Sequence, residues 1–214
     1  KTNNTKLLHK ISPVYEGTLG GYILRDRLWF FGAGRKTNGS TQRALRAVPI
    51  GDASRASTDF TTTTDEKRWE GKLTGQITDK HNLSFSYLDV NSTQEGAVFT
   101  TTSYDLEQLS GRSDPQKLKS GHYNGILTQS WLLEAQYSAM DWGVAIGNGS
   151  QFTDFIRGTI VRNRADGNAR YNSPTFCGVC DKETRSNDSW NAKTHYFLSS
   201  SNLGNHDIVG GIER

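Results

Sequence analysis

Residues 68–88 read RWEGKLTGQITDKHNLSFSYL, two stretches of alternating apolar and polar residues around the short polar turn DKHN. Successive side chains of a β-strand point to opposite faces. The apolar residues Trp69, Leu73 and Ile77 therefore share one face of the first stretch with two glycines, and the polar residues at 70, 72, 74, 76 and 78 share the other. This pattern predicts a β-hairpin with one apolar and one polar face.

The hairpin pattern occurs four times, at about residues 14–35, 68–88, 120–139 and 191–212, and predicts about eight strands. Short turns near 24–27, 79–82, 129–130 and 202–205 close the hairpins, whereas long polar segments, 38–66, 93–118 and 142–189, separate them. Within the last segment, residues 155–161 are β-like and are expected to extend a strand or form a small hairpin. Short turns that alternate with long loops are typical of an antiparallel transmembrane β-barrel with periplasmic turns and extracellular loops.

Proline placement agrees with this division of the chain. Pro13, Pro49, Pro115 and Pro174 are expected at a strand start or in a loop, because proline cannot donate a hydrogen bond to a sheet ladder. None of the four is expected to interrupt a strand.

The composition is unusual for a water-soluble domain. Only 34% of the 214 residues are hydrophobic and the mean hydropathy is −0.66, with 22 glycines. A soluble domain this poor in apolar residues approaches disorder, whereas a membrane barrel needs apolar side chains only at alternate strand positions. No run approaches the roughly 20 apolar residues of a membrane-spanning helix. The net charge of +3 is spread along the chain and does not indicate nucleic acid as a partner.

Residues 15–33, YEGTLGGYILRDRLWFFGA, resemble the early barrel of TonB-dependent outer-membrane receptors, and in particular the Oar-like branch, in which a TLGGPI…KDKLWFFGA phrase occurs. Tyr22 stands where that phrase has proline. Residues 68–87 and 197–211 look like later hairpins of the same barrel. The resemblance implies that residues 1–214 are a partial barrel domain, about eight strands of a barrel of about 22, whose plug domain and remaining strands are not in this chain.

Further properties follow from this resemblance. It implies a location in the bacterial outer membrane, contact with outer-membrane lipids, and energy from the periplasmic TonB complex through an N-terminal part. It also implies import of a bulky ligand, which the sequence does not identify, with no cofactor and no enzymatic reaction. An open sheet in lipid would leave costly unpaired backbone groups at its edges, so further strands are expected to close it. Because the sequence starts without a signal segment and stops within a strand pattern, we expect it to be an internal piece of a longer precursor.

Alternation assigns candidate residues to each face. On the apolar face, aromatic residues near strand ends are expected to form girdles at the two membrane interfaces: Trp69, Tyr87, Trp131 and Tyr137. On the opposite face, polar residues are expected to line the lumen or contact the plug: Glu70, Lys72, Gln76, Glu134 and Gln136. Ordinary sheet packing for the aromatics and simple solvation for the polar residues are the alternatives.

The segment 142–189 contains both cysteines. Cys177 and Cys180 form a CxxC without further Cys or His ligands nearby, which favours a short disulfide that stiffens a loop tip over a metal or redox site. Tyr171, Phe176 and Trp190 are candidate ligand-facing residues of the same exposed loop. Residues 181–188 lack the glycine and the final glutamate of a calcium-binding EF-hand loop.

The five histidines do not form a catalytic or metal-binding pattern. There is no HExxH spacing, no defensible Ser/His/Asp order and no phosphate-binding loop, so we expect neither an enzyme nor a metal site. His81 and His206 are interpreted as solvated turn residues, and His122 and His195 as polar-face residues that could line the lumen; His9 has no assigned role.

Three functions remain open at this point. The first is a receptor and transporter that captures its ligand with the outer loops. The second is a smaller closed barrel of about eight strands that acts as a structural anchor or adhesin. The third is a soluble all-β module that binds carbohydrate or uses its CxxC in redox chemistry, which requires two sheets that pack their apolar faces together.

Overall fold

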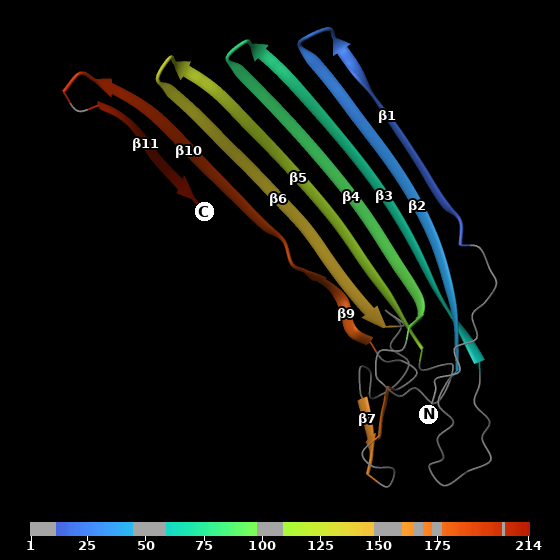
Figure 1. Cartoon of the computed structure of the whole chain (residues 1–214). Coiled ribbons are helices and arrows are strands. Elements are labelled where there is room, and N and C mark those ends of the chain that lie inside the picture. The colour runs from blue at the N-terminus through green and yellow to red at the C-terminus, as the bar shows by residue number, and fades with distance from the viewer. Residues whose placement is uncertain are drawn as a thin grey trace.

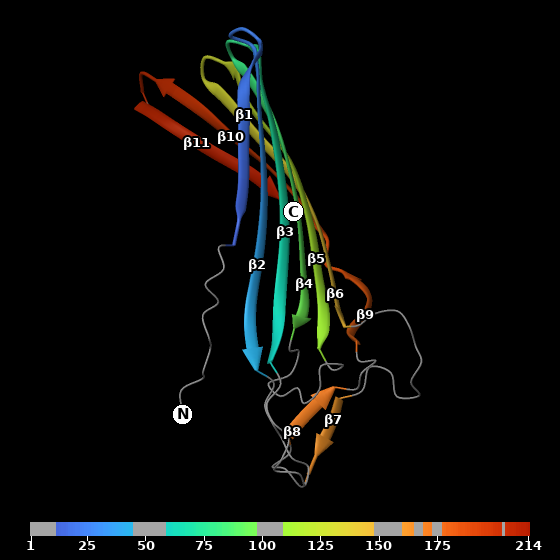
Figure 2. The ribbon, with the colours of Figure 1, turned by 90° about the vertical axis from the view of Figure 1, so that its right-hand side faces the viewer.

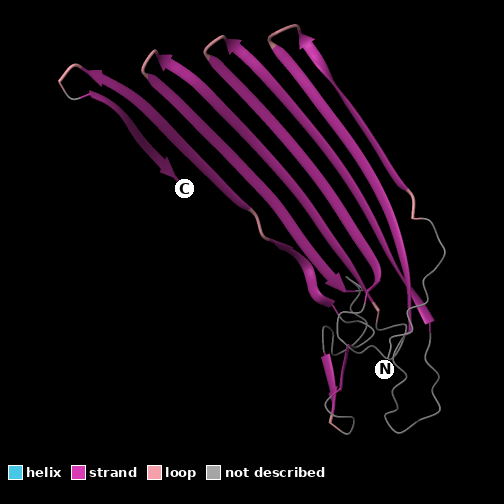
Figure 3. Ribbon diagram, viewed as in Figure 1, coloured by secondary structure: helices cyan, strands magenta, loops and turns pink. Residues whose placement is uncertain are grey.

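The computed structural model describes residues 12–44, 59–97, 109–147, 160–164, 169–172, 177–202 and 204–214. These residues form eleven strands and no helix (Figure 3). The bounds are β1 Val14–Leu24, β2 Leu28–Ala44, β3 Asp59–Thr78, β4 His81–Ala97, β5 Ser110–Thr128, β6 Trp131–Gly147, β7 Ile160–Asn163, β8 Ala169–Asn172, β9 Cys177–Thr184, β10 Asn187–Ser200 and β11 Gly204–Glu213. In this part of the chain no helix is long and apolar enough to span a membrane.

Nine of the strands form one antiparallel sheet in the order β1-β2-β3-β4-β5-β6-β10-β11, with β9 paired to the far part of β6. Figure 1 shows β1 and β11 at opposite edges of this sheet, and Figure 2 shows it from the side as a single curved and twisted layer. The expected all-β antiparallel architecture, with its four hairpins, is therefore confirmed.

All four hairpin turns lie at one end of the sheet, the upper end in Figure 1. We call this the turn end, and the opposite end the distal end. The first turn places Asp26 at a φ of 60°, a left-handed conformation that Asp tolerates better than most residues, and the Arg27 amide donates to the Leu24 carbonyl at 3.1 Å. Gly204 takes the corresponding strained position, with φ 79°, after the last turn.

The strands are longer and the distal loops shorter than the sequence pattern predicts. β3 has 20 residues and β5 has 19, so both run through segments expected to be loops. Pro115 consequently lies inside β5, contrary to expectation. It pairs with Asn91 on the β4 side, but on the β6 side the ladder passes from Ser113 and Ala145 to Gln116 and Trp142, where proline has no amide hydrogen to donate. Pro13 directly precedes β1, whereas Pro49 and Pro174 lie outside the described residues.

A small hairpin, β7 and β8, forms a separate two-stranded sheet near the distal end (Figure 2). The β-like character of residues 155–161 thus belongs in part to a loop hairpin, with Ile160 and Val161 in β7 and the preceding residues outside the described part of the chain.

The sheet does not enclose a hydrophobic core. Among the described residues only two hydrophobic side chains are buried, Phe60 and Val144, whereas Trp69 is 64% exposed and Leu73 is 46% exposed. A soluble sandwich would cover these side chains with a second sheet. Within the described residues no second sheet covers this face, which differs from the two packed sheets that the soluble module requires.

Aromatic rings on the apolar side pack against glycines of neighbouring strands. The ring of Trp69 lies over Gly34, where an added Cβ would come within 2.6 Å of the indole, and Phe85 lies over Gly121 in the same way. Glycines on this face therefore leave room for large rings on a sheet that has no other layer to pack against.

Candidate functional site: the polar face and the distal wall

Cross-strand register places the side chains of the sheet on two faces. Residues directly opposite each other in an antiparallel pair share a face. The polar face contains the row Lys72, Ser86, Ser120, Ser138 and Ser189 and the row Thr74, Ser84, His122, Gln136 and Asn191. The apolar face contains the intervening row Phe30, Leu73, Phe85, Gly121, Tyr137 and Trp190. We use the names polar face and apolar face for these two surfaces.

The candidate lumen residues all lie on the polar face. Lys72 and Gln136 belong to the rows above, and a third row contains Gln76 and Glu134 together with Asn82, Asn124 and Lys193. Glu70 is opposite Ala33 and Leu88 and accepts a hydrogen bond from Arg68 at 3.2 Å. The structure thus brings these five side chains onto one continuous polar surface.

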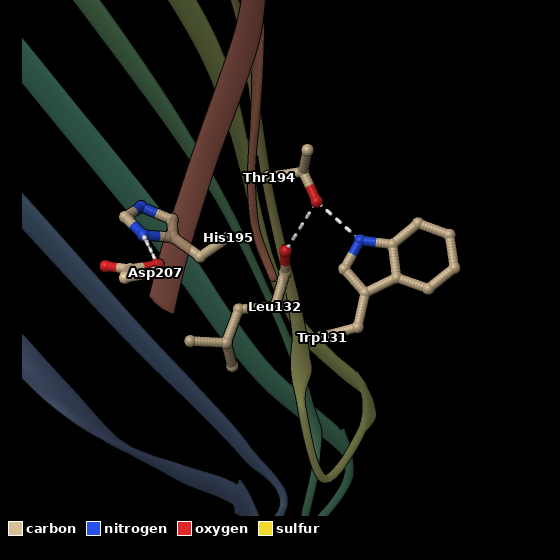
Figure 4. A network of polar contacts seen from close by, with 5 residues as sticks. All are labelled: Trp131, Leu132, Thr194, His195 and Asp207. Atoms are coloured by element: carbon tan, nitrogen blue, oxygen red, sulfur yellow. Dashed lines mark hydrogen bonds and ion pairs between the residues drawn. The ribbon is translucent and has the colours of Figure 1, made fainter. Parts of the chain in front are cut away.

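Hydroxyl groups connect neighbouring strands across this surface. Ser86 and Ser120 are hydrogen-bonded at 2.6 Å, and Ser138 and Ser189 at 2.8 Å. Figure 4 shows how the two faces separate at β10. The indole of Trp131 in β6 donates to Thr194 on one side, and His195 lies 3.7 Å from Asp207 of β11 on the other. His122 and His195 therefore occupy the expected face.

A shallow groove of about 250 Å³ lies on the polar face between the first strands. Its wall combines the aromatic ring of Phe31 with the charged residues Glu16, Arg35, Arg68 and Glu70. Phe31 lies on the polar face because it is opposite Lys72. The sequence pattern predicts polar side chains on that face, so an aromatic ring there is unexpected. The groove offers both an aromatic surface and charges of both signs to a polar ligand.

A second cluster on the polar side lies toward the distal end, where β5, β6 and the chain after β9 meet. We call it the distal wall: Arg112, Asp114, Trp142, Glu183 and Arg185. Arg112 donates to Asp114 at 2.5 Å and Arg185 donates to Glu183 at 2.8 Å. The guanidinium of Arg185 lies 5.2 Å from the centre of the Trp142 ring, a cation–π distance.

Two polar atoms of the distal wall have no partner in the described part of the chain. They are Oδ1 of Asp114 and Nε1 of Trp142, and both are shielded from solvent, so they are not accessible to a ligand in this conformation. The hydrogen bond from Arg185 lowers the pKa of Glu183 below its ordinary value. The distal wall therefore offers the exposed charges of Glu183 and Arg185 beside an aromatic ring, a set of groups that suits recognition of a polar ligand.

Sequence reasoning missed the distal wall because its residues come from three separate segments. The only local signals are the pairs Arg112 and Asp114, and Glu183 and Arg185, which are two residues apart and therefore on the same side of a strand.

The ligand-facing loop candidates have different outcomes. Trp190 does not lie in a loop. It is part of β10, which begins at Asn187, and it lies on the apolar face opposite Tyr137, where it is 37% exposed. Phe176 lies outside the described residues, and Tyr171 is described only by its backbone in β8.

The cysteines begin the short strand β9, where Cys177 pairs with Gly147. Only their backbone is described, so the disulfide remains a prediction. In the described part of the chain no three His, Cys, Asp or Glu side chains gather as a metal site.

The predicted girdle residues share the apolar face but differ in their position along the strands. Trp131 is the first residue of β6, close to the turn end. Trp69 lies in the middle of β3, because this strand continues to Asp59, and Tyr87 and Tyr137 lie inside β4 and β6. The expectation that all four lie near strand ends is therefore wrong for the latter three.

Two histidines also differ from expectation. His81 is the first residue of β4, half-buried on the apolar face, with its Nδ1 2.7 Å from the Tyr123 hydroxyl and its ring stacked on that tyrosine. His206 lies within β11 rather than in the turn. The interpretation of these two as solvated turn residues is wrong, because both hairpins have tighter turns than expected. His9 lies outside the described residues.

Comparison with known proteins gives a likeness in fold. No protein-family model matches the chain, and no curated protein sequence is significantly similar to it. Among solved structures, the outer membrane transporter YddB from Escherichia coli is similar with a TM-score of 0.59 and 11% sequence identity, over 94% of this chain. The chain spans 24% of the length of YddB. At this identity the likeness concerns the fold alone: an antiparallel sheet like part of an outer-membrane transporter.

Proposed function

We propose that this chain forms part of the wall of a bacterial outer-membrane transporter, with the apolar face toward lipid and the polar face toward the lumen. The observation that carries the proposal is the segregation of charge. Between the turn end and about the middle of the long strands, the polar face has Glu70, Lys72, Glu134 and Lys193, whereas no Asp, Glu, Lys or Arg of the described strands lies on the apolar face at this depth. Arg214, which follows β11, pairs with Trp190 at the edge of this face. Lipid tolerates such a face and water does not favour it.

The depth of the uncharged surface supports the membrane assignment. On the apolar face, the first charged residue of β2 is Lys36, eight residues beyond Leu28, and that of β4 is Asp89, eight residues beyond His81. About nine residues at about 3.3 Å each extend roughly 30 Å, or roughly 23 Å along the membrane normal at a tilt of about 40°. The apolar band of outer-membrane barrels is about 25 Å tall.

The open edges of the sheet favour a large barrel over the small closed alternative. A closed barrel made from these strands would pair β1 with β11, but the two lie at opposite edges. Unpaired backbone groups cost several kcal/mol each in lipid. We therefore propose that additional strands pair with both edges, as in a barrel of about 22 strands with a plug.

The finer function rests on the resemblance of residues 15–33 to TonB-dependent receptors. The proposal is that the protein captures a bulky ligand at the distal end, with the distal wall among its contacts, and imports it without chemical change. Energy would come from the periplasmic TonB complex.

Fractionation of cells that express the whole protein, of which this chain is proposed to form part of the wall, tests the general proposal. The expected result is recovery in the outer-membrane fraction, with a mobility in SDS gels that changes on heating. Recovery as a soluble periplasmic protein would contradict it. Co-purification of the periplasmic TonB domain with protein extracted from these membranes tests the finer proposal separately. An outer-membrane protein that does not bind this domain would support the membrane-wall proposal and contradict TonB-driven import.

A further inference from the structure

The apolar face changes character abruptly toward the distal end. Beyond the uncharged band, charged side chains occur on this same face of five neighbouring strands and of β10. We call this set the charged belt: Lys36, Asp65, Lys67, Asp89, Lys117, Lys119, Asp141 and Asp188. If the band lies in the hydrocarbon, as the proposed function requires, the belt lies at the level of the outer-leaflet headgroups.

Positive charge is concentrated in the belt at β2 and β3. Lys36 and Lys67 are direct cross-strand partners, an arrangement in which like charges repel. Both ammonium groups lie 4.0 Å from one carboxylate, that of Asp65. In the amide orientation that its neighbours require, Asn38 also donates a hydrogen bond to this carboxylate at 2.7 Å. These two cations share one anion, so they form a locally positive group within a belt of four lysines and four aspartates, with Glu95 farther toward the distal end on the same face.

A second part of the belt lies on β4, β5 and β6. Lys117 is opposite both Asp89 and Asp141 and lies 4.0 Å from the Asp89 carboxylate. Lys119, the next residue on this face, has no ion-pair partner within the described ranges. A shallow groove of about 300 Å³ runs beside these lysines, with Asp141, Asp188 and Tyr137 also in its wall.

We propose that the lysines of the charged belt bind phosphate groups of outer-leaflet lipid headgroups, with Lys36 and Lys67 as the principal site and Lys119 as a second contact. Each ammonium group has three donors, and both side chains are about half exposed, so donors remain for a further ligand. Phosphate supplies both negative charge and acceptors. Lysines near a membrane surface are attracted to anionic headgroups. The aspartates limit the net charge, which favours individual phosphates over a general attraction to anionic surfaces.

The position of the belt separates this site from the transported ligand. Trp69 is on the same face as Lys67, one step closer to the turn end, and its exposed indole suits the membrane interface. Lys72 and Lys193 lie at similar or shallower depth on the opposite face. They provide a control with the same change in charge.

The test compares Lys36→Gln/Lys67→Gln with Lys72→Gln/Lys193→Gln in protein purified from outer membranes in a non-ionic detergent. Native mass spectrometry counts retained phosphorylated lipid, and titration with bis-phosphorylated lipid A or its dephosphorylated form measures affinity. We expect the belt variant to bind the phosphorylated form about ten-fold more weakly, with the control variant unchanged and the dephosphorylated form weak throughout. An unchanged belt variant, or an equal loss in the control, would overturn the proposal.

Two further outcomes are informative. Displacement of the lipid by inorganic phosphate at equal concentration would show that the site recognises free anions and would overturn the lipid assignment. Heat-modifiability of each variant reports whether it has assembled. A wild-type protein that is absent from the outer membrane contradicts the proposed function, whereas an assembled protein with unchanged lipid binding contradicts only this inference.

Discussion

The two faces of the same strands differ in polarity although their residues alternate along one chain. Leu73 and Thr74 are neighbours in β3, yet Leu73 is in a row with Phe30 and Phe85, and Thr74 is in a row with Trp29 and Ser84. A soluble sheet would have to cover the first row, but a membrane barrel leaves it exposed to lipid. The comparison teaches that alternate positions of the strands create an apolar surface even though the chain as a whole has few hydrophobic residues.

The largest expected effect comes from placing a charge on each face. Leu73→Arg should cost about 2–4 kcal/mol of barrel stability, because arginine at mid-depth on a lipid face is poorly solvated. Thr74→Arg should cost much less, since its side chain reaches the polar surface. The measurement is the heat-modifiable fraction in outer membranes and the urea midpoint after folding into lipid vesicles. Equal losses in both variants would mean that the faces are not assigned correctly.

A smaller effect should separate two glycines on the apolar face. Gly17 and Gly34 are cross-strand partners, but an added Cβ at Gly34 meets the Trp69 ring at 2.6 Å and 2.9 Å, whereas nothing lies within 4 Å at Gly17. Gly34→Ala should therefore destabilise the barrel by about 1 kcal/mol through displacement of the indole, with a change in Trp69 fluorescence. Gly17→Ala is the matched control and should be nearly neutral; a larger effect at Gly17 would remove the packing explanation.

The hydroxyl contacts of the polar face should contribute less still. A double-mutant cycle of Ser86→Ala and Ser120→Ala should give a coupling energy of about 0.5–1 kcal/mol, the usual net value of a neutral hydrogen bond. Urea unfolding in lipid vesicles measures each corner of the cycle. Coupling within error of zero would indicate that water replaces this contact in the lumen.

The smallest effect on stability is expected for the cysteine pair. Because Cys177 and Cys180 close only a short loop, Cys177→Ser/Cys180→Ser should leave assembly nearly unchanged. In intact cells, a membrane-impermeant maleimide should label these thiols only after reduction. Labelling without reductant would exclude the predicted disulfide, and stoichiometric zinc that disappears in the double variant would favour a metal site.

Period-two alternation was sufficient to predict the hairpins and the faces, because each depends on local spacing alone. Residues 68–78 alternate without exception, and the predicted faces of residues 68–76 agree with the register, which shifts between Gln76 and Thr78. The distal strand ends were not predictable in this way. In β3, Thr61 to Thr64 and the charged residues that follow are polar at every position, so alternation carries no signal where both faces contact water.

The distal wall shows a second limit. Asp114, Trp142 and Arg185 are brought together by the pairing of β5 with β6 and by the return of the chain through β9. The sequence near each residue does not determine how these distant strands pair. The sequence predicts Trp190 in a loop for a related reason. The residues before it are polar at every position, so alternation does not reveal where β10 begins, although its partner Tyr137 is predicted on the apolar face.

The most direct test of the two-faced membrane wall is a nitroxide scan of residues 69–77 in the assembled protein, with the native cysteines replaced by serine. Collisions with oxygen report lipid exposure, and collisions with a water-soluble nickel complex report access to water. We predict that positions 69, 71, 73, 75 and 77 favour oxygen and positions 70, 72, 74 and 76 favour nickel, in strict alternation. Equal access to nickel on both faces, or a reversed phase, would contradict the account.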